Sequence, residues 1–182
     1  VDVSGFWTAF VVAGPSCALF RGVRVDHVTH GVYVDMPAGC VRVERSRLIG
    51  PGPQGEGYAG RGVVANAVVD TLTIEDTEIA DFAYGVHDEY MQVDSLTIRR
   101  SLLHDAGFSA VYLADYCYDC APPALGASRP AGRAPRAGVP APPQRGPQDG
   151  PPTSQAVVIE GSRLARSNND LVRLSTTLRR VV

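Results

Sequence analysis

The segments TLTIEDTEI (residues 71–79) and SLTIRRSLL (residues 95–103) begin 24 residues apart and carry apolar residues at the same second, fourth and ninth positions. The same plan recurs in CALFRGVRV (residues 17–25), CVRVERSRL (residues 40–48) and AVVIEGSRL (residues 156–164). Alternating apolar and polar residues indicate a β-strand with one buried face. Recurrence of such a pattern every two dozen residues or so indicates units that stack on one another.

A second short block accompanies each of these segments. The blocks read GVYVD, GVVAN, GVHDE, AVYLA and LVRLS, and they start at residues 31, 62, 85, 110 and 171. Each repeat therefore predicts two short strands of period two. Leucine-rich repeats carry a different signature, and helical repeats space their apolar residues by three and four, so neither fits. We predict an all-β chain that forms a right-handed parallel β-helix of about six rungs, with Leu72 and Leu96 as vertical neighbours.

Residues 121–154 interrupt the repeats. They contain 10 of the 14 prolines, together with many Gly, Ala and Arg residues. Such a segment buries too little apolar surface to offset its ordering entropy. We predict β-helix rungs over residues 1–120, a disordered Pro-rich loop over 121–154 and the last rungs over 155–182. The loop is interpreted as an insertion on the rim, with a flap over a binding face as the alternative. Because the chain starts inside patterned sequence, we also expect further rungs or domains of a longer chain as partners.

Composition narrows the classes of function. The formal net charge is −2 and all 17 basic residues are arginine, without a concentrated basic stripe, which argues against a general nucleic-acid binder. No apolar segment approaches the roughly 20 residues of a membrane span. The four cysteines are few for a disulfide scaffold, and one C-x-x-C is a weak zinc signal. Cys117 and Cys120 form a local disulfide or are incidental thiols. Cys17 and Cys40 occupy equivalent positions on neighbouring rungs, where stacking of like residues is a simpler interpretation than a disulfide.

The stretch YGVHDEY (residues 84–90) crowds His87, Asp88 and Glu89 together. The aligned repeats place Asp88 in an inward column that otherwise reads Val34, Ala65, Leu113 and Leu174. A carboxylate there is costly unless it is paired or hydrogen-bonded, so either the backbone bulges to expose it or another group holds it. The spacing from His87 to the next repeat contains one extra residue, which favours the bulge.

The alignment also predicts an outward surface of aromatic, acidic and amide side chains. One column holds Phe10, Tyr33, Val64, His87, Tyr112 and Arg173, and the column beside it holds Asp35, Asn66, Glu89, Ala114 and Ser175. Such a surface suits a linear polysaccharide, because aromatic faces contact sugar rings and polar groups bind hydroxyls. The alternative is a solvated sheet face with ordinary cross-rung pairs. On the first interpretation, the predicted substrate-binding residues are Tyr33, Asp35, Asn66, Glu89 and Asp115.

The repeat unit G-[VI]-x-[VL] … [LV]-x-I-x-x-[ST]-x-[LI] resembles the right-handed parallel β-helix repeats of the pectin-lyase-like superfamily, over residues 5–120 and 155–178. The resemblance implies the fold and an extracellular or cell-surface location. The superfamily includes polysaccharide lyases, glycoside hydrolases, uronan epimerases, phage tailspikes and structural modules, so the fold by itself does not select an activity.

A narrower resemblance concerns the stretch around His87. YGVHDE, followed by LTIRRSLLHDAGFSAVYLADY, is similar to the catalytic rung of mannuronan C5-epimerases, whose motif is Tyr-Gly-Phe-Asp-Pro-His-Glu (or Asp). Tyr84 and Gly85 match, and Glu89 matches the terminal acid. His87 and Asp88 supply the two central residues in swapped order, and the family's proline is missing. Because that proline fixes the backbone that aims the histidine, its geometry is not carried over.

Proton abstraction from a uronic acid requires a base, a proton donor and a positive group beside the carboxylate. His87 is the predicted base, because an unperturbed imidazole has a pKa near neutrality. Tyr84 or Tyr112 is the predicted donor, and Asp88 is predicted to orient the imidazole.

Arg173 or Arg99 is the predicted cation, since a planar guanidinium matches a carboxylate. No cofactor is required on this interpretation. An alternative places Ca²⁺ among the carboxylates of Asp88, Glu89 and Asp115.

A glycoside hydrolase needs two carboxylates across a bond, and Asp81 and Asp105, one rung apart, are the candidate pair. They share a turn position with His27 and Arg166, and His104 lies beside Asp105, so solvated turn residues are the preferred interpretation.

The predicted function is that of a carbohydrate-active protein, a polysaccharide lyase or C5-epimerase-like enzyme that acts on a linear uronic-acid polysaccharide. The alternative is a noncatalytic β-helix, a binding or structural segment of a larger secreted or surface protein.

Overall fold

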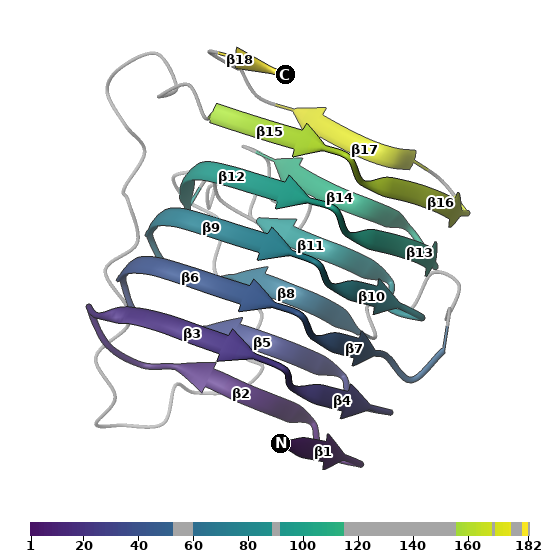
Figure 1. Ribbon diagram of the computed structural model, residues 1–182, viewed down its shortest axis with the longest axis horizontal. Coiled ribbons are helices and arrows are strands. Elements are labelled where there is room, and N and C mark those ends of the chain that lie inside the picture. Colours follow the sequence, from purple (N-terminus) through teal and green to yellow (C-terminus); the bar gives the residue numbers. More distant parts are fainter. Residues whose placement is uncertain (53–59, 89–91, 115–155, 169, 176–179, 182) are drawn as a thin grey trace, which may run out of the picture.

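Three parallel sheets of six strands make up the part of the protein that the computed structural model describes, and no helix occurs in that part. The described residues are 1–52, 60–88, 92–114, 156–168, 170–175 and 180–181. Each turn of the chain adds one strand to every sheet, so the rungs stack from β1–β3 at one end to β16–β18 at the other (Figure 1). The all-β prediction and the prediction of stacked parallel strands are confirmed, and the arrangement is a β-solenoid of six rungs.

The strands have the following bounds. The first sheet contains β1 (Asp2–Ser4), β4 (Arg24–Asp26), β7 (Arg47–Ile49), β10 (Glu78–Ala80), β13 (Leu102–Ala106) and β16 (Arg163–Ser167). The second sheet contains β2 (Thr8–Val12), β5 (His30–Val34), β8 (Arg61–Ala65), β11 (Tyr84–Asp88), β14 (Ser109–Ala114) and β17 (Asp170–Ser175). The third sheet contains β3 (Cys17–Arg21), β6 (Ala38–Glu44), β9 (Val69–Glu75), β12 (Val93–Arg99), β15 (Ala156–Glu160) and β18 (Arg180–Val181).

The register agrees with the aligned repeats. Leu72 pairs with Leu96 and Ile74 with Ile98, and in the second sheet Val86 pairs with Val111. The number of strands in each repeat differs from the prediction, because a rung has three strands instead of two. The apolar ninth position of the repeat belongs to a separate short strand of the first sheet, such as β7 or β10, each three residues long.

The inward columns form one apolar core. Members that are only 0–1% exposed include Val41, Val43, Leu72, Ile74, Leu96 and Ile98. At about 25 cal/mol per Å² of apolar surface, this burial is the main stabilising contribution, and no single rung achieves it alone. In the first rung the predicted outward position of Phe10 is wrong by one residue. Phe10 pairs with the buried Val32 and Val11 with Tyr33, and the Phe10 ring packs 5.0 Å from that of Phe20.

A column of hydroxyl side chains at the corner between the third and first sheets joins the rungs. The Oγ atoms of Ser46, Thr77 and Ser101 donate to the carbonyl two residues earlier at 2.7, 2.8 and 2.8 Å. Each oxygen also accepts a backbone N–H from the neighbouring rung: Val23 to Ser46 at 3.2 Å, Ser46 to Thr77 at 3.3 Å and Thr77 to Ser101 at 3.1 Å. Because these groups are buried, the Ser or Thr of the repeat satisfies corner amides that water does not reach.

Two corners of most rungs place one residue in the left-handed backbone region. At the first corner these residues are Gly22, Arg45, Asp76, Arg100 and Gly161, with φ between 46° and 63°. At the second corner His27, Asp81, Asp105 and Arg166 have φ between 53° and 59°, which confirms that they share a turn position. A left-handed non-Gly residue costs roughly 1–2 kcal/mol, which the stacked core offsets.

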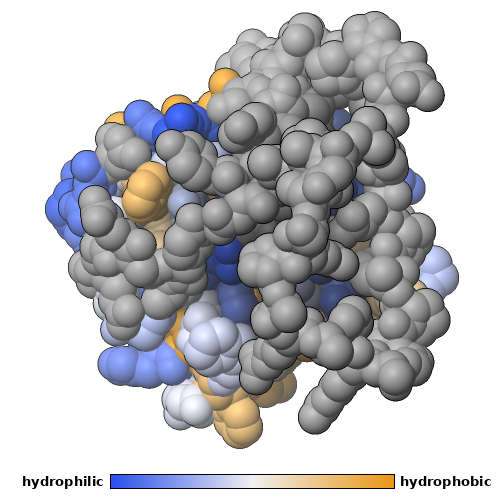
Figure 2. Space-filling model, turned by 180° about the vertical axis from the view of Figure 1, so that it is seen from behind, coloured by the Kyte–Doolittle hydropathy of each residue, from blue (hydrophilic) through white to orange (hydrophobic). Residues whose placement is uncertain are grey.

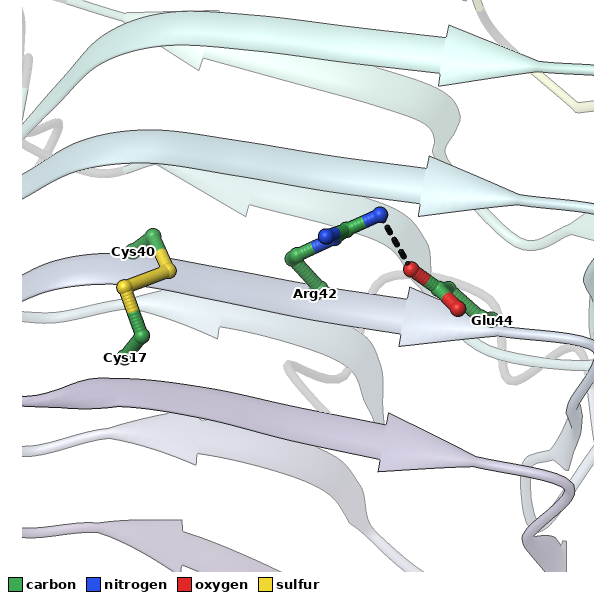
Figure 3. The surroundings of a disulfide bond; sticks show 4 residues. All are labelled: Cys17, Cys40, Arg42 and Glu44. Atoms are coloured by element: carbon green, nitrogen blue, oxygen red, sulfur yellow. Dashed lines mark ion pairs between the residues drawn. A yellow bond between two sulfur atoms is a disulfide. The ribbon is translucent and has the colours of Figure 1, made fainter.

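A disulfide joins the first two rungs, with a Cα–Cα distance of 4.4 Å between Cys17 and Cys40 (Figure 3). The interpretation of these cysteines as merely stacked thiols is therefore wrong. On β6, Arg42 forms an ion pair with Glu44 at 2.5 Å, and Arg21 of β3 reaches Glu44 at 2.7 Å (Figure 3 shows the first). The proline-rich residues 121–154, Cys117 and Cys120 lie outside the described residues.

Thr77→Val is predicted to lower the free energy of unfolding by about 1–3 kcal/mol, because it leaves the Ser46 amide without its hydroxyl acceptor. Thr77→Ser keeps the hydroxyl and is expected to cost less than about 1 kcal/mol. Urea unfolding monitored by circular dichroism measures both. Equal stability of the Val and Ser variants would show that the hydroxyl column contributes nothing.

Cys17→Ser is predicted to destabilise the protein by about 3 kcal/mol under oxidising conditions, because the bridge closes a chain segment of one rung. Under a strong reductant the parent and the variant are expected to unfold at similar denaturant concentrations. Mass spectrometry of a non-reduced tryptic digest identifies the Cys17–Cys40 peptide directly. A digest in which these two cysteines carry a thiol-alkylating label without prior reduction contradicts the assignment.

Candidate functional site

The outer face of the second sheet gathers aromatic, imidazole and guanidinium side chains. His30, Arg61 and Tyr84 lie in one hydrogen-bonded register at the start of β5, β8 and β11. Tyr33, Val64, His87, Tyr112 and Arg173 occupy the neighbouring outward column of β5, β8, β11, β14 and β17. Figure 2 views the molecule from the side on which this sheet lies, and where residues are coloured, hydrophilic and hydrophobic patches lie next to one another.

Glycines bring these rungs together. Gly31, Gly62 and Gly85 directly follow the three register positions, and a Cβ built at Gly31 or at Gly62 would lie 2.5 Å from the carbonyl oxygen of the next glycine. That distance leaves no room for a side chain, which explains the glycine at the start of the repeat. In an ideal strand, residues three apart face opposite sides, yet at this corner Tyr84 and His87 share the outer face with their rings stacked.

Arg61 lies between two histidines, and we call His30, Arg61 and His87 the central triad. The Arg61 Nε–H donates to His87 Nδ1 at 2.6 Å, and Arg61 Nη1 lies 3.4 Å from His30 Nε2. A guanidinium has donors and no acceptor, so both imidazole nitrogens must accept. The geometry therefore assigns a neutral His87 with its proton on Nε2 and a neutral His30 with its proton on Nδ1, directed at Thr8 Oγ1 3.4 Å away.

Aromatic rings surround the triad on four rungs. The Tyr84 ring is stacked on His87 with centroids 4.3 Å apart and planes 8° apart. Tyr112 lies 5.2 Å from His87, while Trp7 and Tyr33 lie 5.9 and 5.5 Å from His30. These rings fix the imidazoles and give the face flat apolar surfaces beside charged ones.

Burial and charge act together on the two imidazoles. Burial is the largest cause that lowers the pKa of His87 to about 3, and the charges of Arg61 and His30 add to it. Burial, followed by the charge of Arg61, lowers the pKa of His30 to about 4. Both histidines are therefore neutral at pH 7, in agreement with the hydrogen-bond assignment. The prediction that the pKa of His87 lies near neutrality is therefore wrong.

Asp88 does not reach the imidazole of His87. Its side chain is 0% exposed, and its two carboxylate oxygens accept the backbone N–H groups of Gln92 at 2.8 Å and Val93 at 3.1 Å. Of the two interpretations of this break in the inward column, the structure supports a carboxylate held by another group. The predicted role in orienting His87 is wrong, because successive strand residues face opposite sides. The extra residue lies between Asp88 and Val93.

The structure brings three of the predicted catalytic side chains together, since Tyr84, His87 and Tyr112 are in mutual ring contact. The guanidinium carbon of Arg173 lies 5.8 Å from the centre of the Tyr112 ring, at the edge of this group. Arg99 belongs to the third sheet, where it meets Glu160 at 3.2 Å, so it does not share the face.

The predicted substrate-binding residues are only partly placed. Tyr33 contacts His30, and the half-buried Asp35 and Asn66 follow β5 and β8 on neighbouring rungs. Glu89 and Asp115 lie outside the described residues. Among the described residues no group of three His, Cys, Asp or Glu side chains has the geometry of a metal site, and we identify no Ca²⁺ ligand.

The alignment missed Arg61 and His30, the two residues that complete the triad. The repeat was aligned from its glycine, so the residue before that glycine was not compared between rungs. The signal was present, because the position before the glycine reads His30, Arg61 and Tyr84 on three consecutive rungs.

Asp105, one of the two carboxylates considered for a glycoside hydrolase, has a structural role. Arg166 Nε lies 2.5 Å from Asp105 Oδ1, and His104 Nδ1 lies 2.6 Å from Asp105 Oδ2. Hydrogen bonds from Arg166 and His104 lower the pKa of Asp105 far below its usual range, so it is not a proton donor at neutral pH. His104 also lies 3.1 Å from Glu78, so a hydrogen-bonded network surrounds the Arg166–Asp105 ion pair at this corner of the first sheet.

The chain matches no protein-family model, no curated protein and no solved structure. Within the described part of the chain, none of the segments forms an apolar helix of membrane-spanning length.

We predict that ¹⁵N NMR of the imidazoles at pH 7 finds the proton of His87 on Nε2 and that of His30 on Nδ1, with neither ring titrating above pH 5. Arg61→Gln is expected to raise both pKa values, because it removes a positive neighbour from each ring. A His87 ring that titrates near pH 6.5 in the parent protein contradicts the triad geometry.

The lowered pKa of His87 also makes the stability of the fold sensitive to acid. The pKa of His87 is about 3 in the folded state against 6.5 as the ordinary value, so the unfolded state binds more protons between those pH values. Stability is therefore full above pH 6.5 and declines as the pH falls toward 3. Denaturant unfolding at pH 7 and pH 4.5 is expected to show a smaller loss for His87→Gln than for the parent.

Proposed function

We propose that the protein is a carbohydrate-active member of the right-handed parallel β-helix class and that it binds a linear uronic-acid polysaccharide along the outer face of the second sheet. The central triad carries the proposal. A guanidinium held by two neutral imidazoles, with aromatic rings on the rungs to either side, matches the combination of carboxylate and flat apolar ring faces in such a polymer.

Arg61 takes the role of the cation that the sequence assigned to Arg173 or Arg99. The substrate carboxylate binds at Arg61, whose positive charge neutralises it. The negative charge that develops on the sugar when the C5 proton leaves is therefore less costly. The rungs follow one another at about 4.8 Å, so a polymer lying along the solenoid axis meets a new set of side chains at each rung. Arg173, three strands from Arg61 in the same sheet, binds a more distant part of the chain.

Lyase or epimerase chemistry uses the groups beside Arg61. The base takes the C5 proton; in a lyase the C4–O bond then breaks and an acid protonates the leaving oxygen, whereas in an epimerase a proton returns to the opposite face of C5. His87 is the proposed base once the substrate carboxylate draws the Arg61 hydrogen bond away from Nδ1. The hydroxyl of Tyr84 or Tyr112 is the proposed acid, because both rings contact His87.

One observation favours a noncatalytic binding protein as the second candidate. In the described state His87 Nδ1 already accepts the Arg61 bond, and a pKa of about 3 makes this imidazole a weak base. A β-helix that only binds the polymer needs the cation and the rings and no proton transfer.

An extracellular or cell-surface location belongs to the same proposal. The Cys17–Cys40 disulfide supports it, because such bonds persist mainly in oxidising compartments.

Arg61→Gln is predicted to reduce turnover by about 10²-fold or more on any uronic polysaccharide that the parent protein converts, because it removes the group that binds the carboxylate. His87→Ala is expected to reduce it by about 10²–10⁴-fold. A similar loss is expected for one of the two variants Tyr84→Phe and Tyr112→Phe, which identifies the acid. The measurements are absorbance of unsaturated products and NMR of C5 epimerisation over a panel of uronic polysaccharides.

Arg99→Gln is the matched control, since it removes an exposed arginine from another sheet and is expected to leave turnover unchanged. If the folded parent protein turns over none of the panel but retains polysaccharide binding that depends on Arg61, the binding candidate replaces the enzyme. If it neither binds nor turns over any member, the proposed function is wrong.

A further inference from the structure

Two imidazoles and a guanidinium in hydrogen-bonding range make an unusual group, because all three can carry positive charge. Arg61 is 2.6 Å from His87 and 3.4 Å from His30, and the two histidines are 5% and 8% exposed. In the described state one member is charged and two are neutral. The triad can therefore gain as many as two protons, one on each imidazole.

We propose that the central triad is a proton-linked oxyanion site, in which a carboxylate or sulfate group of a ligand binds beside Arg61 and the imidazoles take up protons as it binds. The inference rests on the proposed function in its choice of natural ligand, an acidic polysaccharide. It goes beyond that function by giving the site a defined dependence on pH.

The surroundings of each ring determine the direction of the linkage. Among the described residues, His87 faces Arg61 of β8, Tyr84 of its own strand and Tyr112 of β14. The carboxylate of the following residue, Asp88, is turned inward and accepts backbone amides. Beyond Tyr112 stands Arg173 of β17.

His30 faces Arg61, Thr8 and the rings of Trp7 and Tyr33. The positive charge of Arg61 thus acts on both imidazoles and opposes their protonation. A ligand anion placed at Arg61 adds negative charge beside both rings, which favours their protonated form.

Linkage then fixes the effect on affinity. A ligand that raises the pKa of a group binds together with a proton, and its affinity increases as the pH falls through the interval between the free and bound pKa values. Sulfate and ordinary carboxylates stay largely ionised at pH 5.5, so the ligand itself does not lose its charge there. One linked proton corresponds to at most about tenfold in affinity per pH unit.

Sulfate is the probe of choice, because it does not titrate in this range. Calorimetry on the whole protein at pH 7.5 and 5.5, in two buffers of different ionisation heat, measures both the dissociation constant and the number of protons taken up. We expect binding to be about tenfold or more tighter at pH 5.5, with net proton uptake, and imidazole NMR to show raised pKa values for His30 and His87 in the presence of sulfate.

Variants separate the three groups. Arg61→Gln is expected to abolish binding, His87→Gln and His30→Gln each to reduce the proton uptake, and the double histidine variant to remove the dependence on pH. His27→Gln, at an exposed corner where the imidazole faces Asp26, is the control and is expected to behave as the parent. Circular dichroism at both pH values confirms that each protein remains folded.

The result that overturns the inference is sulfate binding of equal strength at both pH values, or no sulfate binding at either, in the folded parent. The same measurements test the proposed function independently of this inference. If sulfate binds with proton uptake while no uronic polysaccharide binds, the site stands and the polysaccharide proposal does not. If a uronan binds through Arg61 without proton uptake, the reverse holds.

Discussion

The in-register pairing of each rung with the next determines every other feature of this protein. Side chains alternate between the two faces of a strand, so a slip of one residue would turn the columns of Leu72 and Ile74 outward. The hydroxyls of Ser46, Thr77 and Ser101 oppose such a slip. Each donates to the carbonyl two residues earlier and accepts a backbone amide of the neighbouring rung. The central triad inherits its geometry from this register, since its three members come from three consecutive rungs.

The sequence predicts the core columns well because burial imposes a strict period of two on residues such as Leu96 and Ile98. It predicts poorly wherever a corner intervenes. The strands of the first sheet were missed because four of the six have only three residues, too few to show a period. Phe10 was misplaced because the first rung has little repeat before it to fix the frame. Asp88 was recognised as an exception, yet its carboxylate accepts two backbone amides, and no side-chain pattern reveals such bonds.

The site was predicted in part for the same physical reason. His87 and Tyr112 occupy a regular outward column, and their proximity follows from the period. Arg61 and His30 precede the glycine corner, where the alternation of an ideal strand no longer says which face a side chain takes. Tyr84 was proposed from a local motif, and its stacking on His87 depends on that same corner. Sequence periodicity thus identifies the face that carries the site. The backbone geometry at the glycine corner places Arg61 at the centre of that face.

The two histidine clusters of the molecule show how the same side chain serves different ends. His104 lies between the carboxylates of Glu78 and Asp105, and Arg166 binds Asp105 in turn, so opposite charges meet at a corner whose backbone is strained. His87 instead accepts from a guanidinium and is buried against tyrosine rings. The first arrangement stabilises a turn. The second lowers the pKa of its histidine and weakens the fold in acid, a cost that an anionic ligand at Arg61 would relieve.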